Sequence, residues 1–314
     1  MKLKKPNFWD YKKPNLISYS LYPISIVLKF IIFLRKKFIK KNNFKGIKKI
    51  CVGNMYLGGT GKTSLSLEIF KILKENNKKV CFIKKYYSNQ LDEHKLLENC
   101  GKLFKERKRN KSIENAIKEN YEFAIFDDGL QDFSIHYDFK IICFNNINWI
   151  GNGLTIPSGP LRESFDNLKK YEHVFINGNL ENVERIKNEI LSLNPKIKIH
   201  FGKYVPLNLD RFNLKKKYLA FSGIGNHQTF LSMLKINGFN VLSNFEFPDH
   251  YNYSQNDLNK IIDMAKKNEC EIITTEKDFL RIDNLKKEKI DFVKSKLKII
   301  DKEKITNEIL NLNE

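Results

Sequence analysis

Short apolar runs alternate along this chain with longer stretches of helical periodicity. Apolar runs at 50–52, 123–126, 218–222 and 271–273 have the length of buried strands. Helical periodicity follows the first of them at 63–73 and appears again from about Gln228. Strands that alternate with helices are typical of α/β folds with a mainly parallel sheet. The pattern therefore predicts an α/β protein, with more chain than one small domain needs.

Three segments are expected from changes in this pattern. Residues 1–45 form a basic and apolar arm, residues 46–205 a first α/β domain, and residues 206–314 a second, smaller α/β domain. Residues 196–209, KIKIHFGKYVPLNL, are interpreted as an extended linker between the two domains. We expect the ligand to bind in the cleft between them, and the smaller domain to close over it.

An apolar segment at 16–34, LISYSLYPISIVLKFIIFL, is interrupted by Pro23 and Lys29. We predict a helix from about Pro23 to Lys40 that contacts a membrane, either lying in its surface or anchored in it. RKKFIKK follows where a secretory signal would need small residues for cleavage. The alternative that the pattern leaves open is a core helix of a soluble domain.

The distribution of charge supports a membrane contact. The net charge is +20, and residues 1–50 hold 13 Lys and Arg35 against the single acid Asp10. A nucleic-acid-binding domain more often spreads its basic residues over a folded face, whereas these bracket the apolar segment. We therefore expect this arm to meet anionic lipids, and we expect no nucleic-acid partner. A basic nucleic-acid-binding NTPase remains as an alternative class.

The five cysteines predict neither a metal site nor a disulfide framework, because they form no CxxC pair. Cys51, Cys81 and Cys143 lie in short apolar runs, where cysteine serves as a small apolar residue. This usage is typical of a reducing cytoplasm.

A glycine-rich turn separates the first apolar run from the first helical stretch. Its glycines allow backbone N–H groups to converge on a polyphosphate at a helix N-terminus. Lys62 is placed to neutralise the β- and γ-phosphates, and the Thr63 hydroxyl to ligate Mg²⁺. The full phosphate-loop pattern has glycine at position 56, where this chain has Tyr56, so a chance turn is the alternative. The expected nucleotide contacts are Gly58, Gly59, Thr60, Gly61, Lys62, Thr63 and Ser64.

Two acidic residues follow the second apolar run. Asp127 and Asp128 come directly after residues 123–126 in the sequence YEFAIFDDGLQ. The carboxyl ends of parallel strands face the ligand in open α/β sheets. Because adjacent strand residues point to opposite faces, one carboxylate is expected to reach Mg²⁺ or its water while the other binds a neighbouring loop. A DDG turn without a function is the alternative.

Several motifs, taken in order, resemble those of one family. VGNMYLGGTGKTS, FDDGLQ, GNGLTIPSGPLRES, AFSGIGN, FPDHYNY and TTEKD run from residue 52 to residue 278. Together they are similar to motifs of the tetraacyldisaccharide 4'-kinases, and GPLRES and FPDHY are much more specific than GKT. The resemblance implies an enzyme that uses ATP and Mg²⁺ to phosphorylate the 4'-hydroxyl of a tetraacyldisaccharide 1-phosphate, a lipid A precursor.

The resemblance also implies an architecture and a location. It implies a P-loop NTPase-like domain joined to a smaller α/β domain, with an N-terminal membrane-contacting helix. The enzyme is then expected at the cytoplasmic face of the inner membrane, held peripherally or by a single N-terminal anchor. The expected partners are the lipid disaccharide and the membrane surface, with no obligate protein partner.

Single residues receive roles from the same resemblance. Asp92 and His250 match an acid and a histidine that act together in activating the sugar hydroxyl, which needs a base within hydrogen-bond reach. Lys62 and Asp128 complete the implied catalytic set. The implied Mg²⁺ ligands are Thr63, Asp127, Asp128 and Glu163. The residues expected to contact the substrate are Asn54, Gln131 and Arg162.

The chain departs from the family pattern just before Asp92. The family usually has SRGYG in this loop, whereas this chain has KKYY at 84–87 and Leu91 in place of a glycine. Lys84 is then available to a phosphate as a point charge, without the two-pronged geometry of arginine.

Membrane-targeted partitioning ATPases provide the alternative function, since they also carry a GGxGKT turn. They have a second lysine before the glycines, and Leu57 occupies that position here, which argues against this class. Such a protein would hydrolyse ATP without a lipid acceptor.

Overall fold

The computed structural model describes residues 5–86, 91–249, 251–282 and 284–313. Its strands are β1 (Lys48–Gly53), β2 (Val80–Ile83), β3 (Leu103–Phe104), β4 (Phe123–Asp127), β5 (Phe139–Asn145), β6 (His173–Asn177), β7 (Lys198–Pro206), β8 (Lys217–Ser222), β9 (Asn240–Glu246), β10 (Glu271–Thr275), β11 (Ile290–Val293) and β12 (Ser295–Ile299). Its α-helices are α1 (Leu16–Phe38), α2 (Lys62–Glu75), α3 (Leu91–Glu98), α4 (Arg109–Lys118), α5 (Val183–Leu193), α6 (His227–Ile236), α7 (Gln255–Lys267), α8 (Glu276–Phe279) and α9 (Lys302–Leu310).

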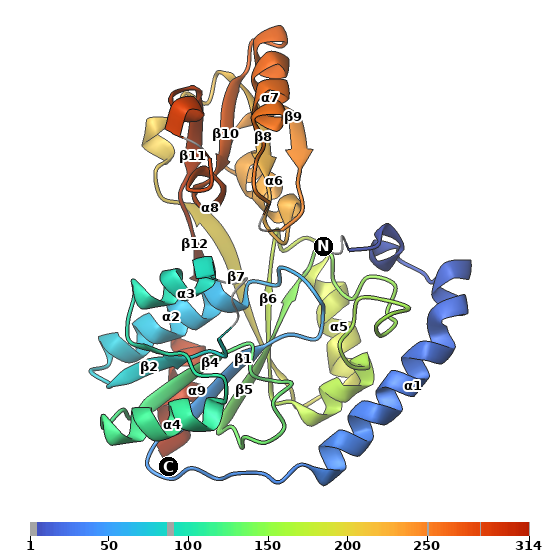
Figure 1. The fold of residues 1–314 in the computed structure, drawn as a ribbon, viewed down its shortest axis with the longest axis vertical. Coiled ribbons are helices and arrows are strands. Elements are labelled where there is room, and N and C mark those ends of the chain that lie inside the picture. Colours follow the sequence, from blue (N-terminus) through green and yellow to red (C-terminus); the bar gives the residue numbers. More distant parts are fainter. Residues whose placement is uncertain (1–4, 87–90, 250, 283, 314) are drawn as a thin grey trace.

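Two α/β units make up the molecule, a large one below a small one in Figure 1. The large sheet has eight strands in the order β12-β7-β6-β5-β1-β4-β2-β3, and the small sheet has four in the order β11-β10-β8-β9. The paired strands run parallel, apart from β12, which is antiparallel to β7. The predicted fold class, α/β with a mainly parallel sheet and a second smaller unit, is confirmed.

Helices cover both faces of the large sheet, which explains why strands such as β2 and β4 are buried along their whole length. On one face α2 and α9 bury Leu65, Ile69, Ile305 and Ile309 against the strands. On the other face α4 and α5 bury residues such as Ile113 and Ile186. The three strand cysteines are fully buried in this core, as small apolar residues are expected to be.

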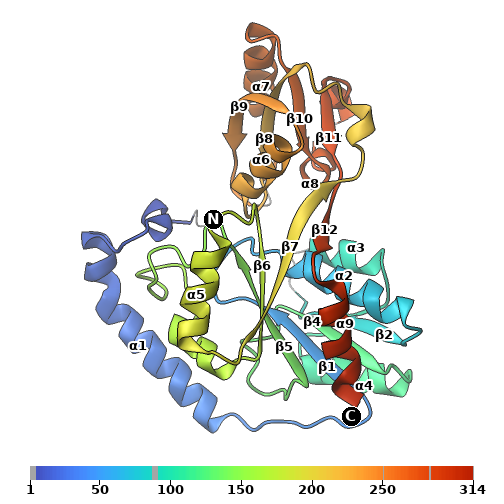
Figure 2. The same ribbon diagram turned by 180° about the vertical axis from the view of Figure 1, so that it is seen from behind.

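The chain leaves the large sheet through β7 and comes back to it through β12. Most of the segment 196–209, interpreted above as a linker, is thus strand β7 of the large sheet, which pairs with β6 and with β12. After β12, α9 packs beside α2 on the same face of the sheet (Figure 2). The chain thus departs from the large sheet after Pro206, and residues 295–310 rejoin the large unit. A short alternating strand such as SKLKI carries no signal for which sheet it joins.

Helix α1 begins at Leu16, so the predicted start near Pro23 was wrong. The Asn15 side chain caps the helix by accepting a hydrogen bond from the Ser18 N–H at 2.9 Å. Pro23 lies inside the helix, and Arg35, Lys36 and Lys37 stand in its last turn. The capping asparagine marks the start of this helix, whereas the proline lies within it and marks no boundary.

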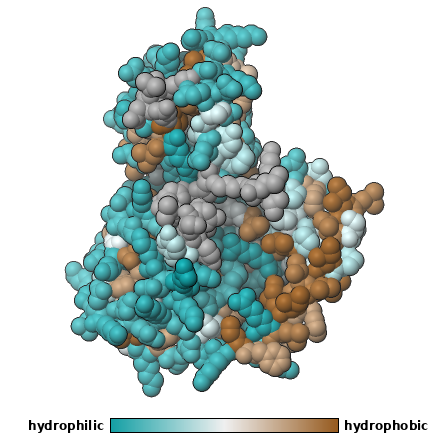
Figure 3. Space-filling view, in the orientation of Figure 1, coloured by the Kyte–Doolittle hydropathy of each residue, from teal (hydrophilic) through white to brown (hydrophobic). Residues whose placement is uncertain are grey.

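The exposed surface of α1 is apolar, which excludes the core-helix alternative. Its buried residues are two serines, Ser18 and Ser25, which contact the loop at 152–158. The apolar side chains face outward and form a continuous brown band in Figure 3. By length and composition, among the described helices, α1 alone is suited to crossing a membrane. The large apolar residues of α1 that are half exposed or more are Leu16, Ile17, Tyr19, Ile24, Ile26, Val27, Phe30, Ile31, Phe33 and Phe38.

Candidate active site

The predicted phosphate loop forms the turn between β1 and α2. Gly61 has a left-handed backbone, with φ of +80°, and α2 begins at the next residue, Lys62. A Cβ at Gly61 would lie 2.8 Å from Asn177 Nδ2 and 2.9 Å from the Tyr204 hydroxyl. The Asn177 amide donates to the Thr60 carbonyl at 2.8 Å. The turn therefore combines the N-terminus of a helix with a backbone shape that neighbouring strands hold in place.

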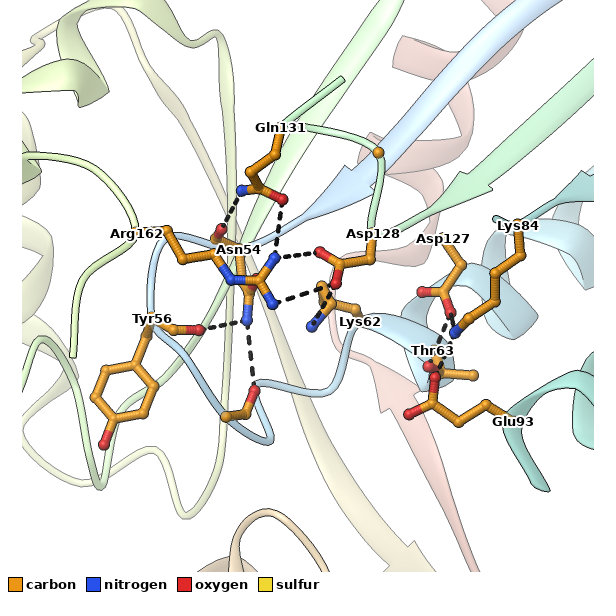
Figure 4. A network of polar contacts seen from close by, with 12 residues as sticks. Asn54, Tyr56, Lys62, Thr63, Lys84, Glu93, Asp127, Asp128, Gln131 and Arg162 are labelled. Atoms are coloured by element: carbon orange, nitrogen blue, oxygen red, sulfur yellow. Dashed lines mark hydrogen bonds and ion pairs between the residues drawn. The ribbon is translucent and has the colours of Figure 1, made fainter. Parts of the chain in front are cut away.

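Asp127 ends β4 and faces the start of α2 (Figure 4). Its carboxylate is fully buried and accepts a hydrogen bond from the Thr63 hydroxyl at 3.1 Å. Lys84 Nζ lies 2.6 Å from the same oxygen and also contacts Glu93 on α3. Burial by itself would lower the pKa of Lys84, but the two carboxylates outweigh burial and raise it. Lys84 is therefore a charged counter-ion for Asp127 and does not point freely toward a phosphate.

Asp128 turns to the other side of the strand end. The two guanidinium nitrogens of Arg162 contact its two carboxylate oxygens at 2.7 and 3.2 Å, and Lys62 Nζ lies 4.0 Å away. Arg162 also donates to Gln131 at 2.8 Å, and Gln131 donates to the Asn54 carbonyl at 3.3 Å. The two adjacent carboxylates thus diverge as predicted, one toward Thr63 and one toward a neighbouring loop.

The charges around Asp128 determine its protonation. Burial acts to raise the pKa of Asp128, but Lys62 and Arg162 outweigh burial and lower the pKa to about 2. A carboxylate with this pKa is ionised at neutral pH and is a weak base. Asp128 therefore serves to hold two cationic side chains near the phosphate loop.

The loop that carries Arg162 packs directly on the phosphate loop. The Arg162 N–H donates to the Met55 carbonyl at 2.6 Å, and the Leu57 N–H donates to the Pro160 carbonyl at 2.8 Å. Tyr56, which replaces the glycine of the full pattern, is buried in this contact, and its hydroxyl donates to Asp10. The departure from the pattern is thus accommodated by a packed aromatic side chain.

Of the predicted site residues that the structure describes, Glu163 is not brought into this cluster. Both carboxylate oxygens of Glu163 accept hydrogen bonds elsewhere, from Asn167 at 2.9 Å and from Tyr171 at 2.8 Å. These contacts do not support Glu163 as a Mg²⁺ ligand. Asp92 is the second residue of α3, but its side chain lies outside the described part, and His250 lies outside the described residues altogether.

Comparisons with known proteins agree with this geometry. Residues 17–314 match the family model described as LpxK, tetraacyldisaccharide-1-P 4'-kinase. The chain is 57% identical over 314 residues to the tetraacyldisaccharide 4'-kinase of Pelagibacter ubique (strain HTCC1062), covering 100% of this chain and 99% of that one. It is 36% identical over 300 residues to that of Rickettsia bellii (strain OSU 85-389), covering 90% of each.

The chain belongs to the tetraacyldisaccharide 4'-kinase family. The activity predicted from the sequence, that of an ATP-binding kinase of lipid A biosynthesis, is therefore confirmed at the level of the family. The fold is also that of a solved structure, LpxK from Aquifex aeolicus in complex with ATP. That structure has a TM-score of 0.66 and 22% identity, and the match covers 95% of this chain and 99% of that one. Membership of this family decides against the partitioning ATPase.

Several residues of this kinase site were missed from the sequence. Asn145 and Asn177 end β5 and β6 beside the phosphate loop, where the carboxyl ends of parallel strands meet. Tyr204 donates to the Ser64 hydroxyl at 3.2 Å from β7. The position of the asparagines at strand ends was the signal that could have revealed them. No comparable signal marks Tyr204, because it lies within a strand.

The ion pairs of Asp128 predict a pH dependence of stability in this kinase. The folded-state pKa of about 2 lies below the ordinary value of 3.8, so the ionised form stabilises the fold above about pH 4, and this contribution is lost as the pH falls toward 2. This difference between the two pKa values corresponds to about 2 kcal/mol of unfolding free energy. We expect the gap in unfolding free energy between the unmodified protein and Asp128→Asn to narrow by this amount between pH 5 and pH 2, as measured by chemical denaturation. Asn suits the backbone of residue 128, where φ is +60°.

The control is Asp210→Asn, at an exposed residue of the Leu209–Arg211 turn. Because this side chain is exposed, Asp210→Asn should change the unfolding free energy little. A constant gap for Asp128→Asn would contradict the low pKa.

Proposed function

We propose that this kinase transfers the γ-phosphoryl group of ATP to the 4'-hydroxyl of a tetraacyldisaccharide 1-phosphate at a membrane surface. The observation that carries the proposal is the convergence of Lys62, Thr63 and Asp127 with the Asp128–Arg162 pair at the start of α2. Phosphoryl transfer needs positioned cations and a bound polyphosphate more than it needs covalent chemistry from the protein. This cluster has the composition for that task.

Mg²⁺ fits beside Thr63 and Asp127. Their hydroxyl and carboxylate oxygens lie 3.1 Å apart, and oxygens of this kind are the ligands that Mg²⁺ prefers. When bound, Mg²⁺ would neutralise charge on the β- and γ-phosphates. The described residues contain no group of three or more His, Cys, Asp or Glu that could hold a metal, so the remaining ligands would be water and phosphate oxygens. Lys84 balances the buried charge of Asp127 at the same carboxylate oxygen that accepts from Thr63.

Lys62 and Arg162 provide positive charge on the other side of the strand end. Because Asp128 touches both, it fixes their positions before the nucleotide binds, and such preorganised charge stabilises a transition state more than mobile charge does. We assign Lys62 to the β- and γ-phosphates. We assign Arg162, together with Gln131 and Asn54, to the acceptor side of the site.

The base that takes the proton from the 4'-hydroxyl must be a different group, because Asp128 is too acidic for that role. We assign this step to Asp92, with His250 as its partner. Helix α3, which carries Asp92, is tied to the end of β4 through the contacts of Lys84 with Glu93 and Asp127. Closure of the small unit over the large one would bring residue 250 toward this helix.

Membrane contact is assigned to α1. The outward apolar side chains of α1 would be buried in a lipid surface, and its flanking lysines would meet anionic headgroups at the cytoplasmic face. Ser25 of α1 contacts Thr155 and Ser158 at 2.9 and 2.8 Å in the loop that leads to Arg162. The same loop thus contacts the membrane helix and supplies a residue of the site, as an enzyme with a lipid substrate requires.

The test is phosphate transfer by the purified protein with ATP and Mg²⁺, measured with a tetraacyldisaccharide 1-phosphate and without any acceptor. We expect a lipid product phosphorylated at the 4' position, and ATP consumption that depends on the acceptor. ATP hydrolysis at the same rate with and without the lipid would contradict the proposal and favour an ATPase.

A further inference from the structure

Three buried polar side chains connect the phosphate loop to the small unit. Asn145 and Asn177 end the neighbouring strands β5 and β6, and Thr229 lies in the first turn of α6. Asn177 Nδ2 donates to the Thr60 carbonyl at 2.8 Å. Asn145 Nδ2 donates both to Asn177 Oδ1 at 3.1 Å and to Thr229 Oγ1 at 2.7 Å. A continuous path of hydrogen bonds therefore runs from the backbone of the phosphate loop to α6.

The β8–α6 loop at 223–226 also touches the phosphate loop directly. A Cβ at Gly59 would lie 2.7 Å from Gly225 Cα, and a Cβ at Gly225 would lie 2.7 Å from Gly59 Cα. Glycine at both positions thus allows the two backbones to meet. Asn226 caps α6 by accepting from the Thr229 N–H at 3.0 Å. The hydrogen-bonded path and the glycine contact therefore hold the same end of α6.

The same β8–α6 loop is fixed on its other side within the small unit. The Gly223 carbonyl accepts a hydrogen bond from Arg281 at 3.2 Å. A Cβ at Gly223 would lie 3.0 Å from the Pro248 carbonyl oxygen and 3.1 Å from Tyr251 Cβ. Residues on both sides of position 250 therefore pack on the loop that contacts the phosphate loop. A shift of α6 relative to the phosphate loop would carry this segment with it.

We propose that Asn145 and Thr229 are positioning residues for phosphoryl transfer. Their hydrogen bond sets the distance between the phosphate loop and the FPDHY segment, and Asn177 links that distance to the conformation of the phosphate loop. This inference rests on the proposed closure of the small unit over the nucleotide. Asn145 suits the role because its Oδ1 accepts from the Ile147 N–H at 3.0 Å, which fixes the orientation of the amide. Asn145 is 2% exposed and Thr229 is 7% exposed, so water does not readily replace a lost partner.

The test uses Thr229→Val, which removes the hydroxyl and keeps the branched shape, so that the backbone cap by Asn226 is retained. Thr229→Ser restores the hydroxyl, and Thr306→Val on α9 is the matched control at a partly exposed threonine. Donor and acceptor dyes are placed on Cys100 of the large unit, which is exposed, and Cys270 of the small unit, which is partly exposed. Energy transfer between the dyes is followed during titration with a non-hydrolysable ATP analogue and Mg²⁺. Steady-state kinetics with ATP and the lipid acceptor accompany the titration.

Nucleotide is expected to change the energy transfer in the unmodified protein. In Thr229→Val the midpoint of this change should move to about tenfold higher analogue concentration, because the phosphate loop is then held less firmly through Asn145 and Asn177 before the nucleotide binds. Thr229→Val should have a lower kcat as well as a higher KM for ATP. For Thr229→Ser and Thr306→Val, the midpoint, kcat and KM should stay within about twofold of those of the unmodified protein. If the midpoint and kcat of Thr229→Val also stayed within about twofold of those of the unmodified protein, the positioning role would be overturned. The proposed closure would not be affected by that result.

A second measurement does not depend on closure. If Asn145 and Thr229 are linked as the structure indicates, Asn145→Ala combined with Thr229→Val should destabilise the nucleotide-free protein by less than the sum of the two single changes. Additive effects would overturn the link itself. No change of energy transfer in the unmodified protein, together with non-additive stability, would instead refute closure and with it the positioning role.

Discussion

Lys62→Ala is expected to lower kcat/KM for phosphate transfer by about 10³-fold, the size of effect seen when a preorganised group that stabilises transition-state charge is removed. Lys62 is the first residue of α2, and its ammonium lies 4.0 Å from Asp128. Removing it takes away the cation assigned to the β- and γ-phosphates, while Arg162 continues to pair with Asp128. The fold should therefore persist, and the loss should appear in transfer of labelled phosphate from ATP to the lipid.

Lys71→Ala is the matched control, since Lys71 lies on the exposed face of the same helix and pairs with Glu68. Its kcat/KM should stay within about twofold of that of the unmodified protein, because an exposed pair of this kind contributes little. Circular dichroism would establish that both variants are folded. A loss of less than tenfold in Lys62→Ala would refute its assignment to the phosphates.

Placing two aspartates on α1, as Phe30→Asp with Phe33→Asp, is expected to weaken binding to vesicles by about 100-fold or more. The two phenylalanines are 59% and 61% exposed on the outward face, and each would bury an apolar ring in the lipid surface. Loss of that burial, at about 1.5 to 3 kcal/mol for each side chain, accounts for the magnitude. The measurement is co-sedimentation of the full chain with vesicles that contain anionic lipids.

The matched control carries aspartate at Ile236 and Leu280, two exposed apolar residues of the small unit. It adds the same charge to the protein without changing α1, so its binding should equal that of the unmodified chain. If the α1 variant sedimented as fully as this control, the membrane contact would have to lie elsewhere in the molecule.

Local sequence determined the elements of the site that depend on local geometry. GGTGKT after a short apolar run predicted the turn before α2, and DD at the end of the next run predicted two diverging carboxylates. Both predictions rest on backbone rules that operate over a few residues. The pairing of Arg162 with Asp128 did not follow from such rules. It required the family resemblance, which placed Arg162 in the site without naming its partner.

Contacts between distant segments were the part that sequence could not supply. Lys84 was interpreted as a possible phosphate ligand, yet it neutralises Asp127, because a fully buried carboxylate needs a counter-ion from whichever segment lies nearest. The return of β12 to the large sheet and the link from Asn145 to Thr229 likewise join residues far apart in the chain. A periodic pattern predicts that a strand forms and leaves its neighbour undetermined.

The register of β7 and β12 has a consequence for how this kinase is built. Pro206 lies opposite Ser295 at the end of their antiparallel ladder, so the two points where the chain enters and leaves the small unit are adjacent. In topological terms, residues 207–294 are an insertion at the tip of a hairpin, and the large sheet is complete without them. The hairpin is then the one covalent pivot of the inserted unit. A ribbon of two hydrogen-bonded strands resists sliding in its own plane and bends more readily across it, so the closure proposed above would follow a rocking path over the phosphate loop.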